Sequence, residues 1–269
     1  MSITRIVSAL VLIAIAGGTI WYLPPVATAM LAAVISGLAA IELGLLVKPL
    51  GARVPQQAAV FGAAATTLAV SAAMSFKPFE PEAAVVMLLG FLMLCGALAL
   101  TFTPGLPVFL SLSVMMMAVL YVGLPLGTIA WIRVAHGPAV LTWLVAVIAI
   151  SDSAQYYSGT LLGSRKLAPV ISPKKTIEGA IGGLIAAVIA GWGLGQWALP
   201  GRTPAVLAGV AVLLAIAGMV GDLFESLLKR SVGAKDSSSL IPGHGGVLDR
   251  VDAYLFAAPV FYIYLRYLA

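Results

Sequence analysis

The residues best suited to chemistry lie near the end of the sequence, between Asp222 and Asp252. Four polar side chains recur there at helical spacing and share one face of a predicted helix, namely Asp222, Glu225, Ser226 and Lys229. Asp249 and Asp252 open the next predicted helix. Carboxylates from two helices suit a hard cation such as Mg²⁺, whose shell is completed by substrate phosphates. The pattern predicts phosphoryl or nucleotidyl transfer, which needs mainly positioning and charge neutralisation. A structural alternative for the second pair is a helix cap at Asp249, with Asp252 in the first turn.

The loop between these carboxylates is basic and rich in glycine. The stretch from Ser226 to Asp252 holds seven of the chain's 25 charged residues and one of its two histidines. Its "GHGG" turn permits backbone geometries in which N–H groups approach a ligand. His244 in this turn is either a phosphate donor or a residue that shapes the loop.

A second cluster is "SDSAQYYSG", which places Asp152 inside an apolar run with Gln155, Tyr156 and Gly159 on its face. A carboxylate within a membrane helix costs about 2.5–3.5 kcal/mol on insertion scales. We therefore expect Asp152 to face the bundle interior or a wet cavity. The alternative is a structural hydrogen bond between helices.

The third cluster is "SPKKTIEGAIGG". Ser172 followed by Pro173 predicts an N-cap and a first helical position, which puts Lys174 and Lys175 beside free backbone N–H groups. That combination suits an anionic phosphate. The alternative is a pair of ordinary lysines at a membrane boundary. The glycines that follow are expected to permit close helix packing rather than to touch a ligand, at Gly179, Gly182 and Gly183.

The elements that must position these residues are membrane helices, because the 269-residue chain is 61% hydrophobic and only 9% charged. A mean hydropathy of +1.09 predicts an integral, all-α, polytopic membrane protein. About 20 residues cross a ~30 Å hydrocarbon core, and apolar runs of that length predict about nine transmembrane helices. The predicted spans are 7–23, 26–47, 57–76, 83–102, 106–125, 138–162, 177–199, 204–228 and 249–268. A cleaved signal peptide is the alternative for the first.

Positive charge predicts the orientation of these spans. Eleven Lys and Arg residues fall on the side that carries the N-terminus, against four on the other, so the N-terminus is expected in the cytoplasm. The charges are also uneven along the chain, with eight in residues 1–134 and seventeen in residues 135–269. We therefore expect residues 1–134 to be lipid-facing scaffold helices and residues 135–269 to carry the catalytic site.

The segment from Ser226 to Asp252 resembles the signature of the phosphatidate cytidylyltransferases, also called CDP-diacylglycerol synthases. The matching residues are Ser226, Leu228, Lys229, Arg230, Lys235, Asp236, Pro242, His244, Gly245, Gly246, Asp249, Arg250 and Asp252, at the family's spacing. "SPKKTIEG" and Asp152 with Tyr156 and Gly159 resemble its upstream motifs. The resemblance covers essentially the C-terminal half.

The resemblance implies transfer of the cytidylyl group from CTP to phosphatidic acid, with Mg²⁺ as cofactor. It implies that Asp222 and Asp249 are metal ligands. It assigns catalytic roles to Lys229, Arg230, Lys235, Asp236, His244, Arg250 and Asp252. Substrate binding falls to Asp152, Tyr156, Lys174, Lys175, Ser226, Gly245 and Gly246. The sequence departs from the common pattern at Ala154, Gln155, Thr160 and Ile177, which bears on the nucleotide or lipid pocket.

The expected partners are CTP, phosphatidic acid and membrane lipid, without nucleic acid, and a homodimer is left open. The expected location is the cell inner membrane, with several spans and the active site facing the cytoplasm. A secondary transporter is the main alternative, because it would also place Asp152 in a wet midplane cavity. A carrier has no need for the basic, glycine-rich segment. Another membrane transferase acting on a lipid phosphate is the second alternative.

Overall fold

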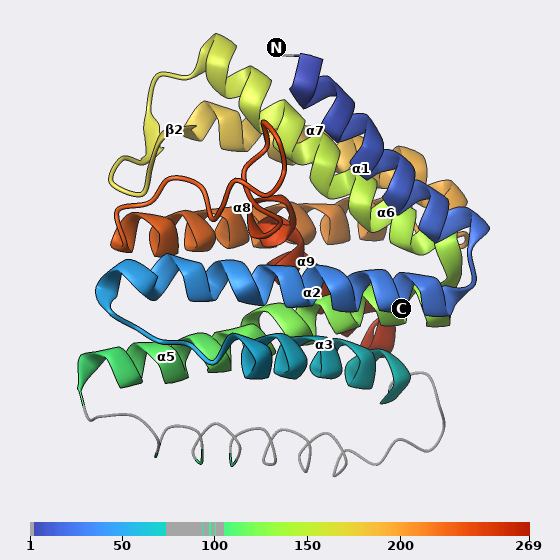
Figure 1. Ribbon diagram of the computed structural model, residues 1–269. Helices are drawn as coiled ribbons and strands as arrows, with labels where there is room; N and C mark the ends of the chain where they lie inside the picture. Colours follow the sequence, from blue (N-terminus) through green and yellow to red (C-terminus); the bar gives the residue numbers. More distant parts are fainter. Residues whose placement is uncertain (1–2, 74–92, 94–96, 98–99, 101–104) are drawn as a thin grey trace. The chain divides into compact units, whose positions relative to one another are not determined.

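The structure is a computed structural model, and it describes residues 3–73, 93, 97, 100 and 105–269 (Figure 1). The predicted span 83–102 lies almost wholly outside these residues. The described chain is mostly helical and divides into two compact units. Unit 1 comprises Met1–Ala135 and Val232–Arg250, and unit 2 comprises His136–Ser231 and Val251–Ala269. The basic, glycine-rich loop therefore belongs to the same unit as the N-terminal helices.

Unit 1 is built from helices that pack through small residues. Its elements are α1 (Ile3–Tyr22), α2 (Pro25–Val47), the short 3-10 helix η1 (Lys48–Leu50), α3 (Gln56–Ala73), α5 (Leu106–Met117), the π-helix η2 (Ala118–Gly123) and the start of α6 (Leu124–Leu162). Helices α2 and α3 lie side by side (Figure 1). Their shared core with α5 and η2 consists of Ala40, Ala59, Ala63, Met115 and Ala118. Small side chains let membrane helices approach closely.

The π-helix η2 is held against α3 by glycine and threonine. A side chain at Gly123 would bring a Cβ within 2.7 Å of the Ala63 carbonyl oxygen, and one at Gly127 would lie 2.6 Å from the Cβ of Val70. The Thr67 hydroxyl lies 3.0 Å from both the Gly123 and Ala63 carbonyl oxygens. A π-turn breaks the regular helical bonding, and Thr67 supplies a donor to one of its carbonyls.

The helix that begins at Leu106 does not end where the sequence predicted. The predicted span 106–125 stopped at Pro125, whereas the helix widens into η2 and continues through α6 as far as a break at Gly137. Pro125 is the second residue of α6, where the π-turn that precedes it accommodates the missing N–H. Gly137 has φ 86°, a conformation that glycine adopts readily, and Pro138 restarts the helix.

Arg133 is a buried cation with a structural partner in unit 1. Its Nε donates to the carbonyl of Ile20 at 2.8 Å and its guanidinium NH2 group reaches the carbonyl of Leu23 at 3.4 Å. The last carbonyls of a helix lack intrahelical partners and attract cations. Arg133 therefore caps the C-terminal end of α1.

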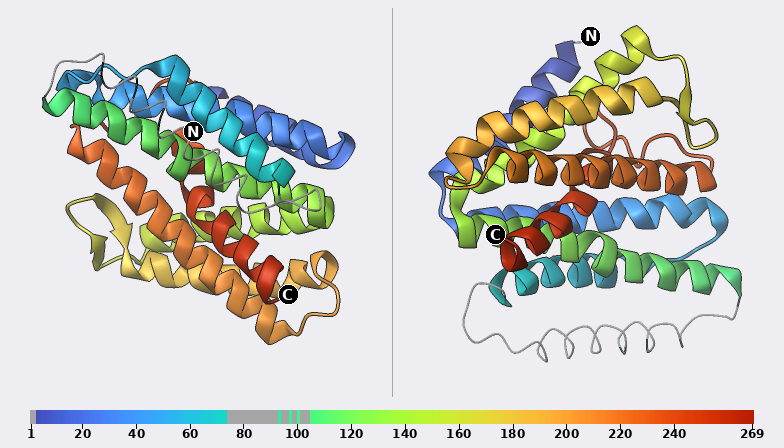
Figure 2. Two further views of the ribbon diagram at one scale, coloured as in Figure 1. Left: turned by 90° about the horizontal axis from the view of Figure 1, so that it is seen from below. Right: turned by 180° about the vertical axis from the view of Figure 1, so that it is seen from behind.

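Unit 2 contains the rest of α6, a short hairpin and three more helices. The hairpin strands are β1 (Lys166–Ala168) and β2 (Ser172–Thr176), and the helices are α7 (Ile177–Ala198), α8 (Pro204–Ser231) and α9 (Leu248–Tyr267). Helices α7 and α8 lie side by side (Figure 2). A Cβ at Gly195 would lie 2.8 Å from the Leu207 side chain, so this close approach requires glycine. The fully buried Trp143 of α6 donates its indole N–H to the Gly191 carbonyl at 3.0 Å and packs against Phe261 of α9.

The glycines of α7 pack against α6, as the sequence predicted. A Cβ at Gly179 would lie 2.8 Å from the Gln155 carbonyl oxygen, and added carbons at Gly182 and Gly183 would overlap Ser158 and Gln155. The two helices approach closely because these positions carry no side chain.

The predicted helix start at Ser172 was wrong. Ser172–Thr176 is strand β2, paired antiparallel with β1 in the register Lys166 to Thr176 and Ala168 to Ser172. Helix α7 begins at Ile177, where the predicted span began but four residues after the predicted first helical position Pro173, because Thr176 is its N-cap and accepts a hydrogen bond from the Gly179 N–H at 3.1 Å. Within the described residues, this hairpin is the departure from the all-α prediction.

Four apolar stretches in the described part of the chain are long enough to cross a membrane, which fits a multi-pass membrane protein. They are Pro25–Leu50, Leu106–Leu162, Ile177–Ala198 and Pro204–Ser231. The second of them contains the break at Gly137. The count of nine spans stays a prediction.

Candidate active site

An ion pair joins two of the sequence clusters within unit 2. The Lys175 ammonium of β2 lies 2.6 Å from a carboxylate oxygen of Asp222 on α8. Both side chains are partly exposed, at 21% and 32%. The Asp222 carboxylate also accepts a long hydrogen bond, 3.4 Å, from Ser226 one turn along the helix. The hairpin therefore brings a lysine to the aspartate that the sequence predicted as a metal ligand.

Two more carboxylates from neighbouring helices lie near this pair. Asp152 of α6 and Asp252 of α9 interact electrostatically with Asp222 and with each other, and Asp152 also interacts with Lys175. We call Asp152, Asp222 and Asp252 the carboxylate cluster. Lys229 also interacts with Asp252, but it is already paired with Glu225, so the three carboxylates and Lys175 leave an excess of negative charge. Like charges held together in this way need a cation or a proton to offset their repulsion.

Close packing of α8 and α9 sets the position of Asp252. A Cβ at Gly221 would lie 2.5 Å from the Asp252 carbonyl oxygen, so the two helices touch next to Asp222. Asp252 also accepts a hydrogen bond from the Ala253 N–H at 2.8 Å. It lies within α9, four residues after the first residue Leu248, so the first-turn alternative does not describe it.

Asp152 lies on an exposed stretch of α6 rather than inside a closed core. Its Oδ1 accepts a hydrogen bond from Gln155 Nε2 at 3.1 Å, and the same amide reaches Ser151 at 3.3 Å. Tyr156 is 68% exposed on the same helix. Gln155 is one of the residues at which the sequence departs from the family pattern, and it contacts a predicted site residue directly.

The other polar pair on α8 is internal to the helix. Glu225 is fully buried and forms an ion pair with Lys229, which is 8% exposed. The sequence placed both residues on the face of Asp222, and the structure agrees. Lys229 therefore has a carboxylate partner before any phosphate arrives, whereas the neighbouring Arg230 is exposed.

The hairpin separates the two lysines of the "SPKK" motif. Successive residues of a strand point to opposite faces. Lys175 is partly buried against Asp222, and Lys174 is exposed. Glu178, in the first turn of α7, holds the start of the hairpin by accepting hydrogen bonds from the Ser164 and Arg165 N–H groups at 3.0 and 3.1 Å. Sequence reasoning did not assign this role to Glu178.

In unit 1, the predicted metal ligand Asp249 is surrounded by donors. Its Oδ2 accepts hydrogen bonds from the Ser237 N–H at 3.0 Å, the Ser237 hydroxyl at 2.9 Å and the Gly246 N–H at 2.8 Å. Asp249 thus folds the loop, in addition to any ligand role. The two predicted metal ligands belong to different units, and their pairing stays a prediction.

Sequence reasoning missed the carboxylate on which this loop is built. Glu42 of α2 is 2% exposed and accepts hydrogen bonds from Ser237, Ser238, Val247 and Leu248. We call this arrangement the loop anchor, and it consists of Glu42, Ser237, Ser238, Asp249 and the backbone of 246–248. A signal for it existed, because an acidic residue inside an apolar run is costly unless it has partners.

The remaining predicted residues of the loop lie on or near its surface. Lys235, Asp236 and Arg250 are exposed. The His244 Nδ1 lies 2.7 Å from the Ser8 hydroxyl of α1, which also lies 3.1 Å from the Pro242 carbonyl. Gly245 has φ 81°, and its carbonyl accepts the Ile241 N–H at 2.8 Å. His244 therefore helps to shape the loop, in line with the second interpretation of it.

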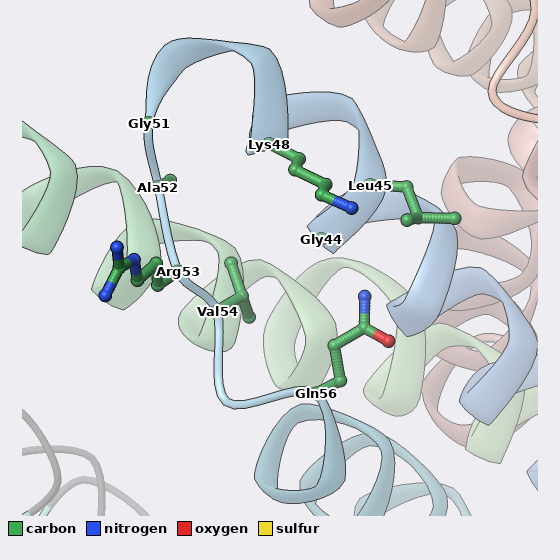
Figure 3. Close-up of a pocket in the computed structure, with 8 residues that line it drawn as sticks. All are labelled: Gly44, Leu45, Lys48, Gly51, Ala52, Arg53, Val54 and Gln56. Carbon is green, nitrogen blue, oxygen red and sulfur yellow. The ribbon is translucent and has the colours of Figure 1, made fainter.

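Unit 1 also has a pocket of about 580 Å³ between α2 and α3, beside the connection between them (Figure 3). Two cations line it, Lys48 and Arg53, with Gln56. Figure 3 shows the Lys48 ammonium and the Arg53 guanidinium pointing to opposite sides of this connection. They do not converge on one anion.

The described residues contain no group of three or more His, Cys, Asp or Glu side chains placed to hold a metal ion by themselves. The donor chemistry of the carboxylate cluster nevertheless fits Mg²⁺. This ion usually takes one or two carboxylates and completes its shell with waters and substrate phosphates.

The chain is mostly helical and has several helices of membrane length, which defines a multi-pass membrane protein. Its site gathers carboxylates and a lysine from three helices and a hairpin, and this combination suits phosphate chemistry. The chain belongs to the cytidylyltransferase family, whose model matches residues 3–268.

Bacterial proteins are similar to the chain. A phosphatidate cytidylyltransferase of Brucella suis is 47% identical over 135 residues, which is 48% of this chain and 47% of that protein. One from Staphylococcus aureus strain COL is 37% identical over 157 residues, or 58% of this chain and 60% of that protein. The uncharacterized protein YnbB of Escherichia coli K12 is 43% identical over 136 residues, covering 50% of this chain and 45% of its own. The matched stretches thus span about half the length of these relatives.

Proposed function

We propose that the protein transfers the cytidylyl group of CTP to phosphatidic acid, releasing pyrophosphate and forming CDP-diacylglycerol. The observation that carries this proposal is the gathering of Asp152, Lys175, Asp222 and Asp252 in one unit. They come from three separate sequence motifs, each of which resembles a motif of the phosphatidate cytidylyltransferases. The names of two similar proteins support the same substrates.

The reaction needs no covalent intermediate on the protein. An oxygen of the lipid phosphate attacks the α-phosphorus of CTP, a new P–O bond forms, and the bond to the β-phosphate oxygen breaks with pyrophosphate as leaving group. Lys175 is placed to stabilise negative charge on a phosphate, once that phosphate competes with Asp222 for the ammonium. Arg230, Lys235 and Arg250 are exposed cations that can contact phosphates.

Mg²⁺ is the proposed cofactor, held by carboxylates and by substrate oxygens. Asp222 is the first proposed ligand, and Asp249 of unit 1 is the second, as the sequence predicted. When bound, the ion would neutralise charge on the triphosphate. The excess of negative charge in the carboxylate cluster supports this assignment, because a divalent cation would offset it.

We further propose nine spans in the cell inner membrane, with the N-terminus and the active site in the cytoplasm, where CTP is available. The eleven-to-four distribution of positive charge supports this orientation. Single cysteines introduced beside Lys174 and Lys235 should resist an impermeant thiol reagent in intact cells. Labelling of either cysteine from outside the cell would contradict the proposed orientation.

The test of the proposed activity is an assay of purified protein with labelled CTP and phosphatidic acid. We expect label in a lipid product together with pyrophosphate, both dependent on Mg²⁺. Replacing phosphatidic acid by diacylglycerol, which lacks the attacking phosphate, should abolish the product. A secondary transporter would leave CTP intact under all of these conditions, so an intact CTP pool would overturn the proposal.

A further inference from the structure

We infer that Glu42 is a positioning residue for the reaction: its buried carboxylate fixes the conformation of segment 237–249, and through it the orientation of Asp249. The inference rests on the proposed function for its kinetic consequence. Its structural basis, the loop anchor, lies entirely within unit 1. The same segment carries His244, and the exposed Lys235, Asp236 and Arg250 flank it.

The Glu42 carboxylate accepts four hydrogen bonds, two at each oxygen. Oε1 accepts from the Ser238 hydroxyl at 2.7 Å and the Val247 N–H at 2.9 Å. Oε2 accepts from the Ser237 hydroxyl at 2.9 Å and the Leu248 N–H at 2.8 Å. All four partners are donors, so the site matches an ionised carboxylate. An amide in its place would turn an NH2 group toward two of them.

Two of these donors lie at the start of α9: the N–H of Leu248, its first residue, and the N–H of Val247, the residue before it. Helix α9 begins at Leu248, and the N–H groups of the first turn have no intrahelical acceptor. A carboxylate is favourable there because the helix dipole is positive at this end. Glu42 thus ties α2 to the residue next to Asp249. This contact fixes the first residue of α9, and with it the backbone position of Asp249.

Ser237 connects Glu42 to Asp249 directly. Its hydroxyl oxygen lies 2.9 Å from Glu42 Oε2 and 2.9 Å from Asp249 Oδ2. A hydroxyl has one hydrogen, so the two carboxylates share it or compete for it. A change in the charge of Glu42 therefore alters the hydrogen bonding of Asp249 without touching that residue.

Gly246 shows how closely the anchor is packed. A Cβ there would lie 2.5 and 2.6 Å from the two Glu42 oxygens and would overlap the Ser237 hydroxyl. The last glycine of the "GHGG" turn, Gly246, is thus required by Glu42, which lies about 200 positions earlier. Close packing against Glu42 therefore explains the glycine at position 246, in addition to any contact of the turn with a ligand.

The decisive experiment compares Glu42→Gln with Ser36→Ala in the full-length protein in detergent. Ser36 is a matched control because it lies on the same helix, is fully buried and has no hydrogen-bond partner among the described residues. Hydrogen exchange of peptides covering 237–250 should become at least tenfold faster in Glu42→Gln. The Ser36→Ala protein should exchange like the unmodified one. Unchanged exchange in Glu42→Gln would overturn the inference.

A serine series keeps the test informative if Glu42→Gln does not fold. Ser237 contacts both carboxylates, Ser238 contacts Glu42, and the exposed Ser239 lies outside the loop anchor. Exchange in the 237–250 peptides should increase most in Ser237→Ala, less in Ser238→Ala and not at all in Ser239→Ala. Equal effects at all three positions would contradict the anchor.

Kinetics separate positioning from simple stabilisation. Loss of folded protein lowers the maximum rate but leaves half-saturation values unchanged. A misplaced Asp249 should lower the maximum rate about tenfold and also raise the half-saturating concentrations of Mg²⁺ and CTP at least threefold. Glu42→Asp, which keeps the charge on a shorter side chain, should recover part of both. Faster exchange with unchanged half-saturation values would mean that Glu42 only stabilises the fold.

Failure of the proposed function gives a different result. If the unmodified protein consumed no CTP, that function would be wrong, and the exchange measurements would still decide whether Glu42 sets the conformation of the segment.

Discussion

The loop anchor and the carboxylate cluster use the same chemical group in opposite ways. In the loop anchor, each Glu42 oxygen lies within hydrogen-bond distance of two donors, and Asp249 Oδ2 lies within that distance of three. The Ser237 hydroxyl is a donor common to both carboxylates. In the carboxylate cluster, Asp152, Asp222 and Asp252 face one another's charge, with one lysine at Asp222. A carboxylate satisfied by donors stabilises a fold, whereas crowded like charges are typical of sites that bind a further ion or substrate. The comparison therefore separates residues that hold the loop from residues free to do chemistry.

The largest expected effect is at Asp222. Asp222→Asn should lower turnover at least hundredfold, or about 2.7 kcal/mol of transition-state stabilisation, and raise the Mg²⁺ requirement. Its thermal unfolding midpoint should change little, because the lost ion pair with Lys175 is partly exposed while repulsion from Asp152 and Asp252 is relieved. Rate assays and unfolding in detergent check both. A strong loss of stability would place Asp222 with the structural carboxylates.

Asp249→Asn should instead lower both the stability of the protein and its turnover. An amide at this position accepts hydrogen bonds less strongly, so the loop should lose about 1–3 kcal/mol of stability, and turnover should fall by at least tenfold. The predicted helix cap at Asp249 is wrong, because α9 begins at Leu248 and the Asp249 carboxylate accepts from Ser237 and Gly246 of the loop. Unchanged rates and unchanged Mg²⁺ dependence would mean that Asp249 only holds the loop.

Gly246→Ala tests the loop anchor by packing alone. The added methyl group would press on Glu42 and Ser237, which should cost about 1–3 kcal/mol of stability. Gly193→Ala is the matched control, because nothing lies within 4 Å of the added carbon and alanine favours a helix. The midpoint of thermal unfolding should fall only for Gly246→Ala. Equal midpoints would show that the turn can relax around the methyl group.

The smallest expected effect distinguishes two adjacent lysines. Lys175→Ala should lower turnover about tenfold, because it leaves Asp222 without its cation. Lys174→Ala, which removes the same charge from the exposed face of β2, should change turnover less than about twofold. Steady-state rates at saturating CTP measure the difference. Equal losses would support two phosphate-binding lysines, as the sequence predicted.

Periodicity was sufficient to locate the helices, and composition was sufficient for the class of protein. The predicted spans 26–47, 177–199 and 249–268 agree within one residue at each end with α2 (Pro25–Val47), α7 (Ile177–Ala198) and α9 (Leu248–Tyr267). Long apolar runs bounded by Pro, Gly or charge leave little choice of boundary. The same reasoning brought Asp222, Glu225 and Lys229 to one helical face.

Local rules failed where a distant residue decided the outcome. "SP" before two lysines fits a helix start, but pairing with Lys166–Ala168 made the segment a strand and moved the cap to Thr176. Glu42 looked like one charge in a scaffold helix, because its partners lie 195 to 206 positions later. In both cases the deciding partner lies outside the local motif, and the sequence indicates at most that Glu42 needs partners, not which residues they are.

The long separation between Glu42 and its donors has a consequence for biosynthesis. A ribosome adding about 5–20 residues per second needs about 10–40 s to pass from Glu42 to Ser237. During that interval α2 carries an acidic side chain whose four eventual donors have not yet been made. A lone charge in a membrane helix costs about 2.5–3.5 kcal/mol on insertion scales, so the early helix must offset that cost with its apolar residues alone. Arrival of the loop then relieves it, which makes the closing of this anchor a late step in assembly of the N-terminal helices.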